Sequence, residues 1–357
     1  NFLLHPWAFG QFRYAANYRQ KAKNGGTDWQ TGFELPRMKL VLDGYVYGPG
    51  LTYQFIWATS DTTGNLGLQD AWARYHIPDS PFAVQGGQIR NPVDHEQIMF
   101  ATKSLTPERS IVNNVLLNSD NVVKGFDVSY GYDGNYPVRA ELAFTSGMRN
   151  FDTTFADFPT NPATWGAAAR VEWKVMGRWE DYSQFTALGD KEPLLVFGGG
   201  ADYTEAGDTD GLIHVADVQL NTPSALTLYA AYLGRYTRHN GGAPGTNGGF
   251  TTGGPFPTTY DATARVLGAY LITRHFEPFA KYEYLNFDHR ELPASAAHRY
   301  INDVGLGFNY YFYGHRAKFS ACASWLPNGS PIANTGADLL ANRTNEVIFE
   351  GQFQLII

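Results

Sequence analysis

The feature that most constrains this chain is an alternation of apolar and polar residues with a period of two, repeated from one end to the other. In the C-terminal segment Val347, Phe349 and Phe353 share one face, while Glu346 and Glu350 share the other. Successive side chains of a β-strand point to opposite faces of a sheet, so this period predicts strands rather than helices. The chain is therefore expected to be all-β. A soluble sandwich alternates as well, so the alternation by itself leaves the type of β-fold open.

The lengths of the segments and of their connections favour a barrel that crosses a membrane. The periodic segments run roughly 10 to 14 residues, which suits a tilted strand in a bilayer and exceeds the ~5 to 6 residues usual in globular sheets. Short connections such as 48–50 alternate with long ones such as 92–122. Residues 177–193 break this alternation, because a long connection falls where a short one is due.

These segments predict a transmembrane antiparallel β-barrel of about 16 strands, with short periplasmic turns and long extracellular loops. The predicted strands are 6–19, 32–47, 51–60, 67–77, 82–91, 123–132, 136–146, 165–176, 194–204, 211–220, 225–237, 260–272, 276–288, 300–313, 316–326 and 345–357. No shift in composition divides the chain, so residues 1–357 are expected to form a single outer-membrane domain. A barrel of this width is expected to enclose water, which would solvate the charges on its inner wall.

Composition and motifs argue against several other classes of protein. The 34 Asp and Glu exceed the 27 Lys and Arg, for a net charge of −7, whereas general nucleic-acid binding depends on clustered positive charge. Cys322 is the single cysteine, and no Cys/His cluster has the spacing of a zinc site. The triple glycine at 198–200 lacks the Gly-Lys-Ser/Thr of a phosphate loop, and we interpret it as close packing or a bulge. We expect no catalytic residue, no metal and no cofactor.

The start at Asn1, without a basic-then-apolar leader, is expected of a mature or trimmed form.

Several phrases occur in an order that resembles the phosphate-selective porin O and P family, over essentially the whole chain. They are GFELPRMKLVLDG at 32–44, LTYQF at 51–55, DAWARY at 70–75, GQIRNP at 87–92, LTPERS at 105–110, ARVEWK at 169–174, EPFAKYEY at 277–284 and GLGFNYYFYGH at 305–315. The resemblance implies a sixteen-stranded porin of the bacterial outer membrane, usually a homotrimer, surrounded by lipid and lipopolysaccharide. It also implies passive diffusion of small hydrophilic solutes, and a connection at 92–122 that folds inward to narrow the pore.

Charged residues of that loop and of the lumen-facing strand positions are the candidate site. The proposed anion-binding and constriction residues are Lys103, Arg109, Arg37, Lys39, Arg74 and Arg90, and the proposed pore-lining acids are Asp43, Asp70 and Glu108. Fixed positive charges in a narrow aqueous pore raise the local concentration of anions. We therefore expect an anion-preferring pore, with phosphate or similar anions among the candidate solutes.

Alternatives to a selective pore remain open at this stage. One is that the loop at 92–122 is pinned by its own ion pairs. Another is that the wall charges cancel in ladders such as Arg170 with Glu172, Arg139 with Glu141 and Lys281 with Glu283. Cancelling wall charges would leave little selectivity, as in a general, weakly selective porin. A separate alternative, of a different class, is a non-conducting structural or adhesive barrel plugged by its loops. Aromatic residues near the strand ends are expected to form girdles at the two membrane interfaces, namely Trp7, Tyr45, Tyr47, Trp57, Tyr75, Trp165, Trp173, Tyr282, Tyr284 and Trp325.

Overall fold

Sixteen antiparallel strands close into one barrel, as predicted, and the first strand pairs with the last. The structure is a computed structural model and describes residues 1–19, 29–60, 63–117, 122–148, 165–206, 209–223, 225–239, 245–247, 250–252, 258–290, 292, 298–332, 337–339 and 345–357. The barrel strands are β1 (Phe2–Tyr18), β2 (Trp29–Val46), β3 (Leu51–Thr59), β4 (Leu66–His76), β5 (Phe82–Arg90), β6 (Val122–Tyr130), β7 (Val138–Thr145), β8 (Trp165–Met176), β9 (Leu194–Ala206), β10 (Thr209–Asn221), β11 (Leu226–His239), β14 (Thr258–Tyr270), β15 (Phe276–Asn286), β16 (Tyr300–Tyr311), β17 (Ala317–Leu326) and β18 (Glu346–Ile356).

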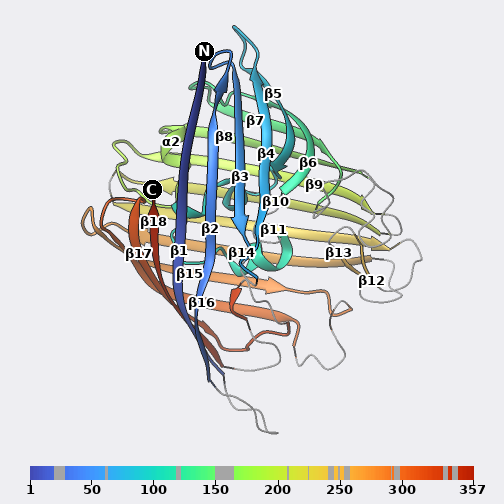
Figure 1. The fold of residues 1–357 in the computed structure, drawn as a ribbon. Coiled ribbons are helices and arrows are strands. Elements are labelled where there is room, and N and C mark those ends of the chain that lie inside the picture. The colour runs from blue at the N-terminus through green and yellow to red at the C-terminus, as the bar shows by residue number, and fades with distance from the viewer. Residues whose placement is uncertain are drawn as a thin grey trace.

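Closure of the barrel gives the strand ladder no free edge between β1 and β18. These strands pair from Phe9 with Ile356 to Tyr18 with Val347. Figure 1 shows the dark-blue β1 beside the red β18. Hydrocarbon offers backbone N–H and C=O groups no partner, so a sheet can cross a bilayer when it closes in this way.

The predicted strand ranges agree with the structure to within a few residues at each end. The largest differences are at the start of the chain, where β1 begins at Phe2 instead of residue 6 and β2 at Trp29 instead of residue 32. A small hairpin that was not predicted, β12 (Gly245–Asn247) and β13 (Phe250–Thr252), lies within the connection between β11 and β14.

In the described part of the chain, no helix is long and apolar enough to cross a membrane.

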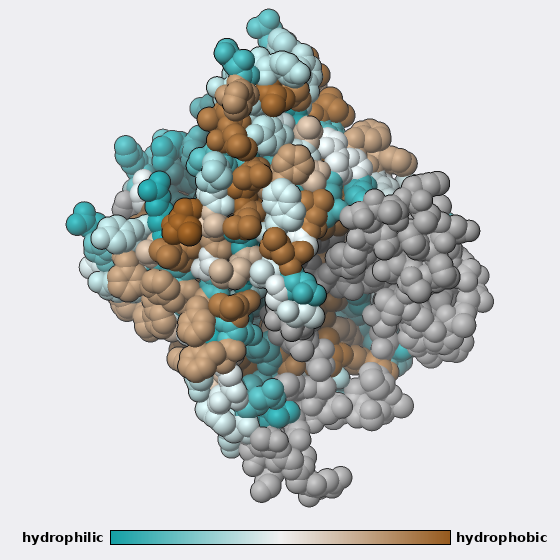
Figure 2. Space-filling model, in the orientation of Figure 1, coloured by the Kyte–Doolittle hydropathy of each residue, from teal (hydrophilic) through white to brown (hydrophobic). Residues whose placement is uncertain are grey.

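The burial pattern of the strands is inverted relative to a soluble protein. On β8, Arg170 and Glu172 are buried, while Val171 and Trp173, at the alternate positions, are each 53% exposed. Figure 2 shows hydrophobic side chains on the outer surface over the N-terminal strands. The apolar side chains therefore face outward and the polar ones face the lumen, as the period of two predicts.

The predicted aromatic girdle is wrong for Trp7. This residue shares the lumen-facing parity of Phe9 and Arg13, and its ring lies 5.8 Å from that of Phe100 inside the barrel. Its Nε1 donates a hydrogen bond to Asp43 at 2.7 Å. Other members of the set, such as Trp165, Trp173 and Trp325, are exposed on the outside.

Residues 91–117, which we call the inserted loop, fold into the barrel. This segment contains α1 (His95–Ile98), η1 (Ala101–Lys103) and η2 (Asn113–Leu117), drawn in teal in Figure 1. Its apolar side chains form a buried cluster with residues on the inner wall of β10, β11 and the strands beyond them. The cluster includes Val93, Ile111, Val112, Leu116, Leu117, Ile213, Val215, Leu233, Leu285 and Ile301.

Wall cations hold the inserted loop from several sides. Arg265 of β14 forms ion pairs with Asp94, at 2.6 Å, and with Glu96. Lys318 of β17 donates to the carbonyl oxygen of Ser104 at 2.6 Å. Ion pairs with the wall therefore hold the described part of the loop, which the alternative of pairs within the loop did not include.

Residues 177–193, which we call the inner strap, enter the lumen from the end with the short connections. The strap begins with α2 (Trp179–Tyr182). Arg170 donates to the hydroxyl of Tyr182 at 3.0 Å, and Thr186 donates to Glu277 at 2.6 Å. The long connection that broke the alternation in the sequence is thus an internal segment.

The inserted loop and the inner strap meet inside the barrel. The rings of His95 and Tyr182 stack with centroids 3.8 Å apart and 12° between their planes. Lys103 donates to the hydroxyl of Ser183 at 2.8 Å. The expectation of a water-filled interior with solvated wall charges is wrong in this region, because two chain segments displace the water and the buried Arg170 is instead paired with Glu172 and Asp217.

The triple glycine lies where these segments press on the wall, which supports close packing as its explanation. A Cβ added to Gly200 would lie 2.1 Å from the carbonyl oxygen of Val93, and one added to Gly198 would lie 2.3 Å from the Arg170 guanidinium. Any larger side chain at these positions would have to displace the inserted loop or the buried arginine.

We predict that Gly200→Val folds into a closed barrel but pushes the start of the inserted loop away from β9. The expected result is an altered single-channel conductance in a planar bilayer, with the heat-modifiable gel band of the wild type retained. Gly199→Val is the matched control, because the nearest atom to a Cβ there is the Val215 oxygen at 3.7 Å. Equal conductance of the two variants and the wild type would contradict the packing argument.

We also predict that Arg265→Met loosens the inserted loop. The change leaves Asp94 and Glu96 without their cation, and removal of one partner of a buried ion pair typically costs about 3–5 kcal/mol. The expected result is a higher open-channel current noise and a reversal potential shifted toward cations. Arg235→Met is the control, because it removes the cation of a buried ion pair between two wall strands, Arg235 of β11 with Asp261 of β14. Current noise of the same size in both variants would contradict a specific role of Arg265 in holding the loop.

Candidate functional site

The predicted site residues separate into pairs that neutralise each other and cations that keep their charge. Arg37 and Glu108 form an ion pair, and Arg13 joins Glu108 from the other side at 2.6 Å. These two guanidiniums hold the pKa of Glu108 at about 2, against the opposing effect of burial. Glu108 therefore links the inserted loop to strands β1 and β2 through ion pairs.

Arg90 and Asp70 form a second neutral pair. Their side chains lie 3.2 Å apart, and Arg90 also donates to the carbonyl oxygens of Gln97, Ile98 and Met99 at the end of α1. Asp43 lies apart from both pairs and accepts hydrogen bonds from Trp7 and His5. This acid faces the lumen near the short-connection end.

Two predicted cations are buried against the protein itself. Arg109 donates to the carbonyl oxygen of Met99 at 3.2 Å and is 4% exposed. Lys39 is buried, with its ammonium 5.8 Å from the centre of the Phe9 ring. The geometry around these two side chains fits a structural role in holding the wall and the inserted loop.

Arg74 and Lys103 differ from Arg109 and Lys39 in being partly exposed to the lumen. Arg74 donates to the hydroxyl of Ser129 at 2.6 Å, and Lys103 to that of Ser183. Both are partly exposed, and partial burial lowers the pKa of Lys103.

Arg74 belongs to a row in which cations alternate with aromatic rings. The ring of Tyr132 lies between Arg74, at 5.3 Å, and Arg139, at 4.9 Å. The ring of Trp179 lies between Arg139, at 4.2 Å, and Lys174, at 5.2 Å. We call these five residues the cation–aromatic row.

The three cations of this row and Lys103 form no ion pair with any carboxylate that the structure describes. Lys174 donates to the amide oxygen of Asn135, and Arg139 donates to the carbonyl oxygen of Tyr132. The Nε atom of Arg139 is buried without a hydrogen-bond partner among the described residues. Cation–π contacts stabilise these charges without neutralising them. The row therefore contributes positive potential to the lumen, where Asp127 and Glu141 also act electrostatically on Arg74.

A half-open cavity of about 160 Å³ lies between the cation–aromatic row and the inserted loop. Lys103 and Arg139 are its cations, and Glu172, which is paired with Arg170, is its one carboxylate. The remaining lining is largely aromatic or apolar and comprises His95, Ile98, Met99, Phe100, Tyr132, Trp179, Tyr182 and Ser183. Burial lowers the pKa of His95, so its ring is neutral at pH 7.

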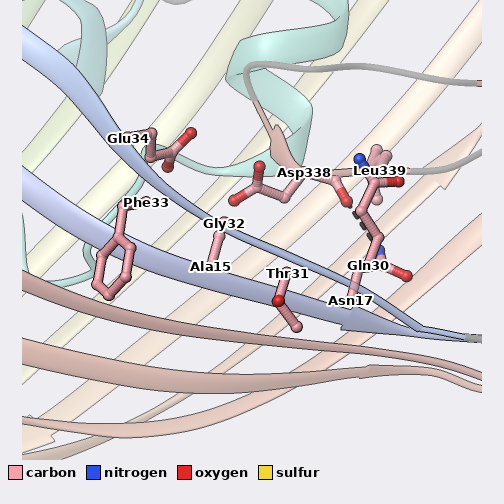
Figure 3. Close-up of a pocket in the computed structure, with 9 residues that line it drawn as sticks. All are labelled: Ala15, Asn17, Gln30, Thr31, Gly32, Phe33, Glu34, Asp338 and Leu339. Atoms are coloured by element: carbon pink, nitrogen blue, oxygen red, sulfur yellow. Dashed lines mark hydrogen bonds between the residues drawn. The ribbon is translucent and has the colours of Figure 1, made fainter.

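A second pocket, of about 240 Å³, lies near the long-loop end and is acidic (Figure 3). Its charged lining residues are Glu34 of β2 and Asp338 of the connection before β18. Arg13 pairs with Glu34 at 3.0 Å and with Glu350 at 3.1 Å. Burial first, and then the charges of Glu350 and Glu34, raise the pKa of Asp338 to about 7.

The sequence interpretation missed most of the cation–aromatic row as a site. Arg139 and Lys174 fall on the lumen-facing parity, but the predicted ladder of Arg139 with Glu141 is not among the described ion pairs. The other two predicted pairs form, at 2.7 Å for Arg170 with Glu172 and 2.9 Å for Lys281 with Glu283. The signal for the row was the unexpectedly long connection at 177–193, which supplies Trp179 to it.

Comparison with known proteins places this barrel among porins. The family profile described as phosphate-selective porin O and P matches residues 10–209, and no curated protein matches the chain. Similar solved structures include an anion-selective porin from Comamonas acidovorans, with 11% identity, all of both chains covered and a TM-score of 0.66. OmpT of Vibrio cholerae, in a trimer form, has 12% identity, 100% and 99% coverage of this chain and that one, and a TM-score of 0.61. OprB of Pseudomonas putida has 9% identity, 99% and 94% coverage and a TM-score of 0.64.

At such low identities the solved structures establish the fold, and the family rests on the profile match. That match spans more than half of the chain and includes β2, the inserted loop and β8. The closed barrel, its inverted burial and its inserted loop agree with the match. The chain therefore belongs to the phosphate-selective porin O and P family and is a porin of the bacterial outer membrane.

Proposed function

We propose that this porin passively conducts small hydrophilic solutes with a preference for anions, and that the cation–aromatic row with Lys103 sets this preference. The observation that carries the proposal is the contrast between two groups of lumen cations. Arg37, Arg90 and Arg170 each have a carboxylate partner, whereas the row has aromatic and neutral partners. An unpaired cation attracts a passing anion, while a paired one is largely cancelled nearby.

We further propose that residues 1–357 act as one domain, that the protein forms a homotrimer and that lipid and lipopolysaccharide surround it. The OmpT structure, described as a trimer form, supports the assembly. The exposed apolar side chains on the outer wall support the contact with lipid. We propose no enzymatic activity. Chemical cross-linking followed by gel electrophoresis of unheated samples tests the trimer.

We predict that Arg139→Gln lowers the preference for anions. A unit charge about 5 Å from a passing ion contributes about 0.8 kcal/mol in water, which is roughly a fourfold change in local ion concentration. The measurement is the reversal potential in a gradient of potassium chloride across a planar bilayer, and Lys103→Gln and Lys174→Gln are expected to act in the same direction. The matched control is Arg238→Gln, because Arg238 lies on the outward parity of β11 and is paired with Asp210.

An unchanged reversal potential in all three lumen variants would refute the assignment of selectivity to the row. A wild-type reversal potential near zero would instead support a general, weakly selective porin. Absence of stable conductance steps would support a plugged, non-conducting barrel.

We predict that the preference for anions increases as the pH falls from about 8 to about 6. Asp338 has a pKa of about 7, so it is largely ionised at the upper end of this range and largely protonated at the lower end. Protonation removes a negative charge from the acidic pocket near the long-loop end, which lowers the local concentration of cations. The reversal potential at a series of pH values is the measurement, and Asp338→Asn is expected to flatten the curve.

Asp288→Asn is the matched control for the pH experiment. Hydrogen bonds from Arg290 hold the pKa of Asp288 below its usual value, so this carboxyl does not titrate between pH 6 and pH 8. The control is expected to keep the wild-type pH step. If Asp338→Asn also keeps it, another group is responsible.

A further inference from the structure

The cavity beside the cation–aromatic row combines two cations with a mainly apolar lining. Lys103 enters it from the inserted loop and Arg139 from β7. Ile98 and Met99 of the inserted loop and Trp179 of the inner strap supply apolar surface. The two positive groups come from different segments of the chain and line one cavity, so both attract an anion that enters it.

This combination suits an organic acid better than an inorganic oxyanion. Phosphate is strongly hydrated and would lose part of its water contacts against the apolar part of the lining. A carboxylate attached to an apolar body pairs its charge with the cations and removes the body from water. The side chains of Ile98 and Met99 and the aromatic residues of the lining add apolar surface against which that body can pack.

The size of the cavity limits the ligand to a small molecule. Its volume of about 160 Å³ lies below the roughly 300–1,000 Å³ typical of sites for drug-sized ligands. Glu172 is held by Arg170 at 2.7 Å, which reduces its repulsion of an incoming carboxylate. The unpartnered Nε of Arg139 adds a buried donor that the described residues leave unused.

We propose that this cavity is a binding site for small organic monocarboxylates with an apolar or aromatic body, which the pore selects over inorganic phosphate. The proposal rests on the proposed anion-preferring pore and names the class of solute for which the pore is built. A single-ring acid such as benzoate would place its carboxylate between Lys103 and Arg139 and its ring on the apolar lining from the inserted loop and inner strap.

The test measures block of the chloride current through the wild-type protein in a planar bilayer by added benzoate, acetate, phosphate or benzyl alcohol. Benzoate is expected to half-block the current at a concentration about tenfold below that of acetate or phosphate, which corresponds to about 1.4 kcal/mol. Benzyl alcohol, which has the ring without the charge, is expected to block weakly. Calorimetric titration of the folded protein in detergent with the same four compounds measures binding independently of conduction.

Variants separate the two parts of the site. Arg139→Gln is expected to weaken the benzoate block by removing charge, and Ile98→Ser by making the lining polar. Ile332→Ser, in the connection before β18, changes an isoleucine that is packed on the apolar cluster of the inserted loop and does not line the cavity. It is expected to leave the benzoate block as in the wild type.

Two outcomes would overturn the proposal. Phosphate or acetate that blocks and binds as well as benzoate would show that charge alone determines binding, and the preference for chloride over potassium would then still support the anion-preferring pore. Benzoate block that is unaffected by both Arg139→Gln and Ile98→Ser would place the site elsewhere. A wild-type pore that shows no preference for chloride but binds benzoate in the calorimeter would refute the proposed anion selectivity. It would leave the proposed binding site in place.

Discussion

The structure depends on one requirement, that every backbone hydrogen-bonding group within the hydrocarbon layer finds its partner inside the protein. Pairing of β1 with β18 meets it by removing the edges of the sheet. A closed ring of sixteen strands then fixes which side chains face lipid and which face the lumen, because successive residues alternate. The inverted burial on β8, with Arg170 inside and Trp173 outside, follows directly from that geometry.

A ring of this size leaves space that the wall residues cannot fill, and two segments of the chain occupy part of it. Their entry takes wall charges away from water, and a buried charge is tolerated when it is paired. This explains the pairs that Arg265 makes with Asp94 and Glu96. The cation–aromatic row is the exception, since ring faces there replace carboxylates as partners. The cations that have rings instead of carboxylates as partners therefore determine how the pore interacts with ions.

Much of the wall was predictable from sequence, whereas the contents of the lumen were not. The strand at 165–176 was placed with the bounds that the structure gives it, because β-periodicity is a local signal. The same period of two accounts for the lumen side of Arg13, Arg139 and Lys174. Which cation meets which carboxylate depends on the path of the inserted loop, and neither parity nor spacing encodes that path. Trp7 was misassigned because its aromatic character outweighed its parity, which it shares with Arg13.

The contact of the inserted loop with the inner strap has a consequence for how such a pore changes over evolution. Each segment is part of a connection between two neighbouring strands. Residues can therefore be added to or removed from either segment without shifting the register of the strand ladder. Because His95 stacks on Tyr182, a change in one segment alters the support of the other. The strand ladder therefore keeps its register when either segment changes, and changes in the two connections can alter the pore without altering the wall.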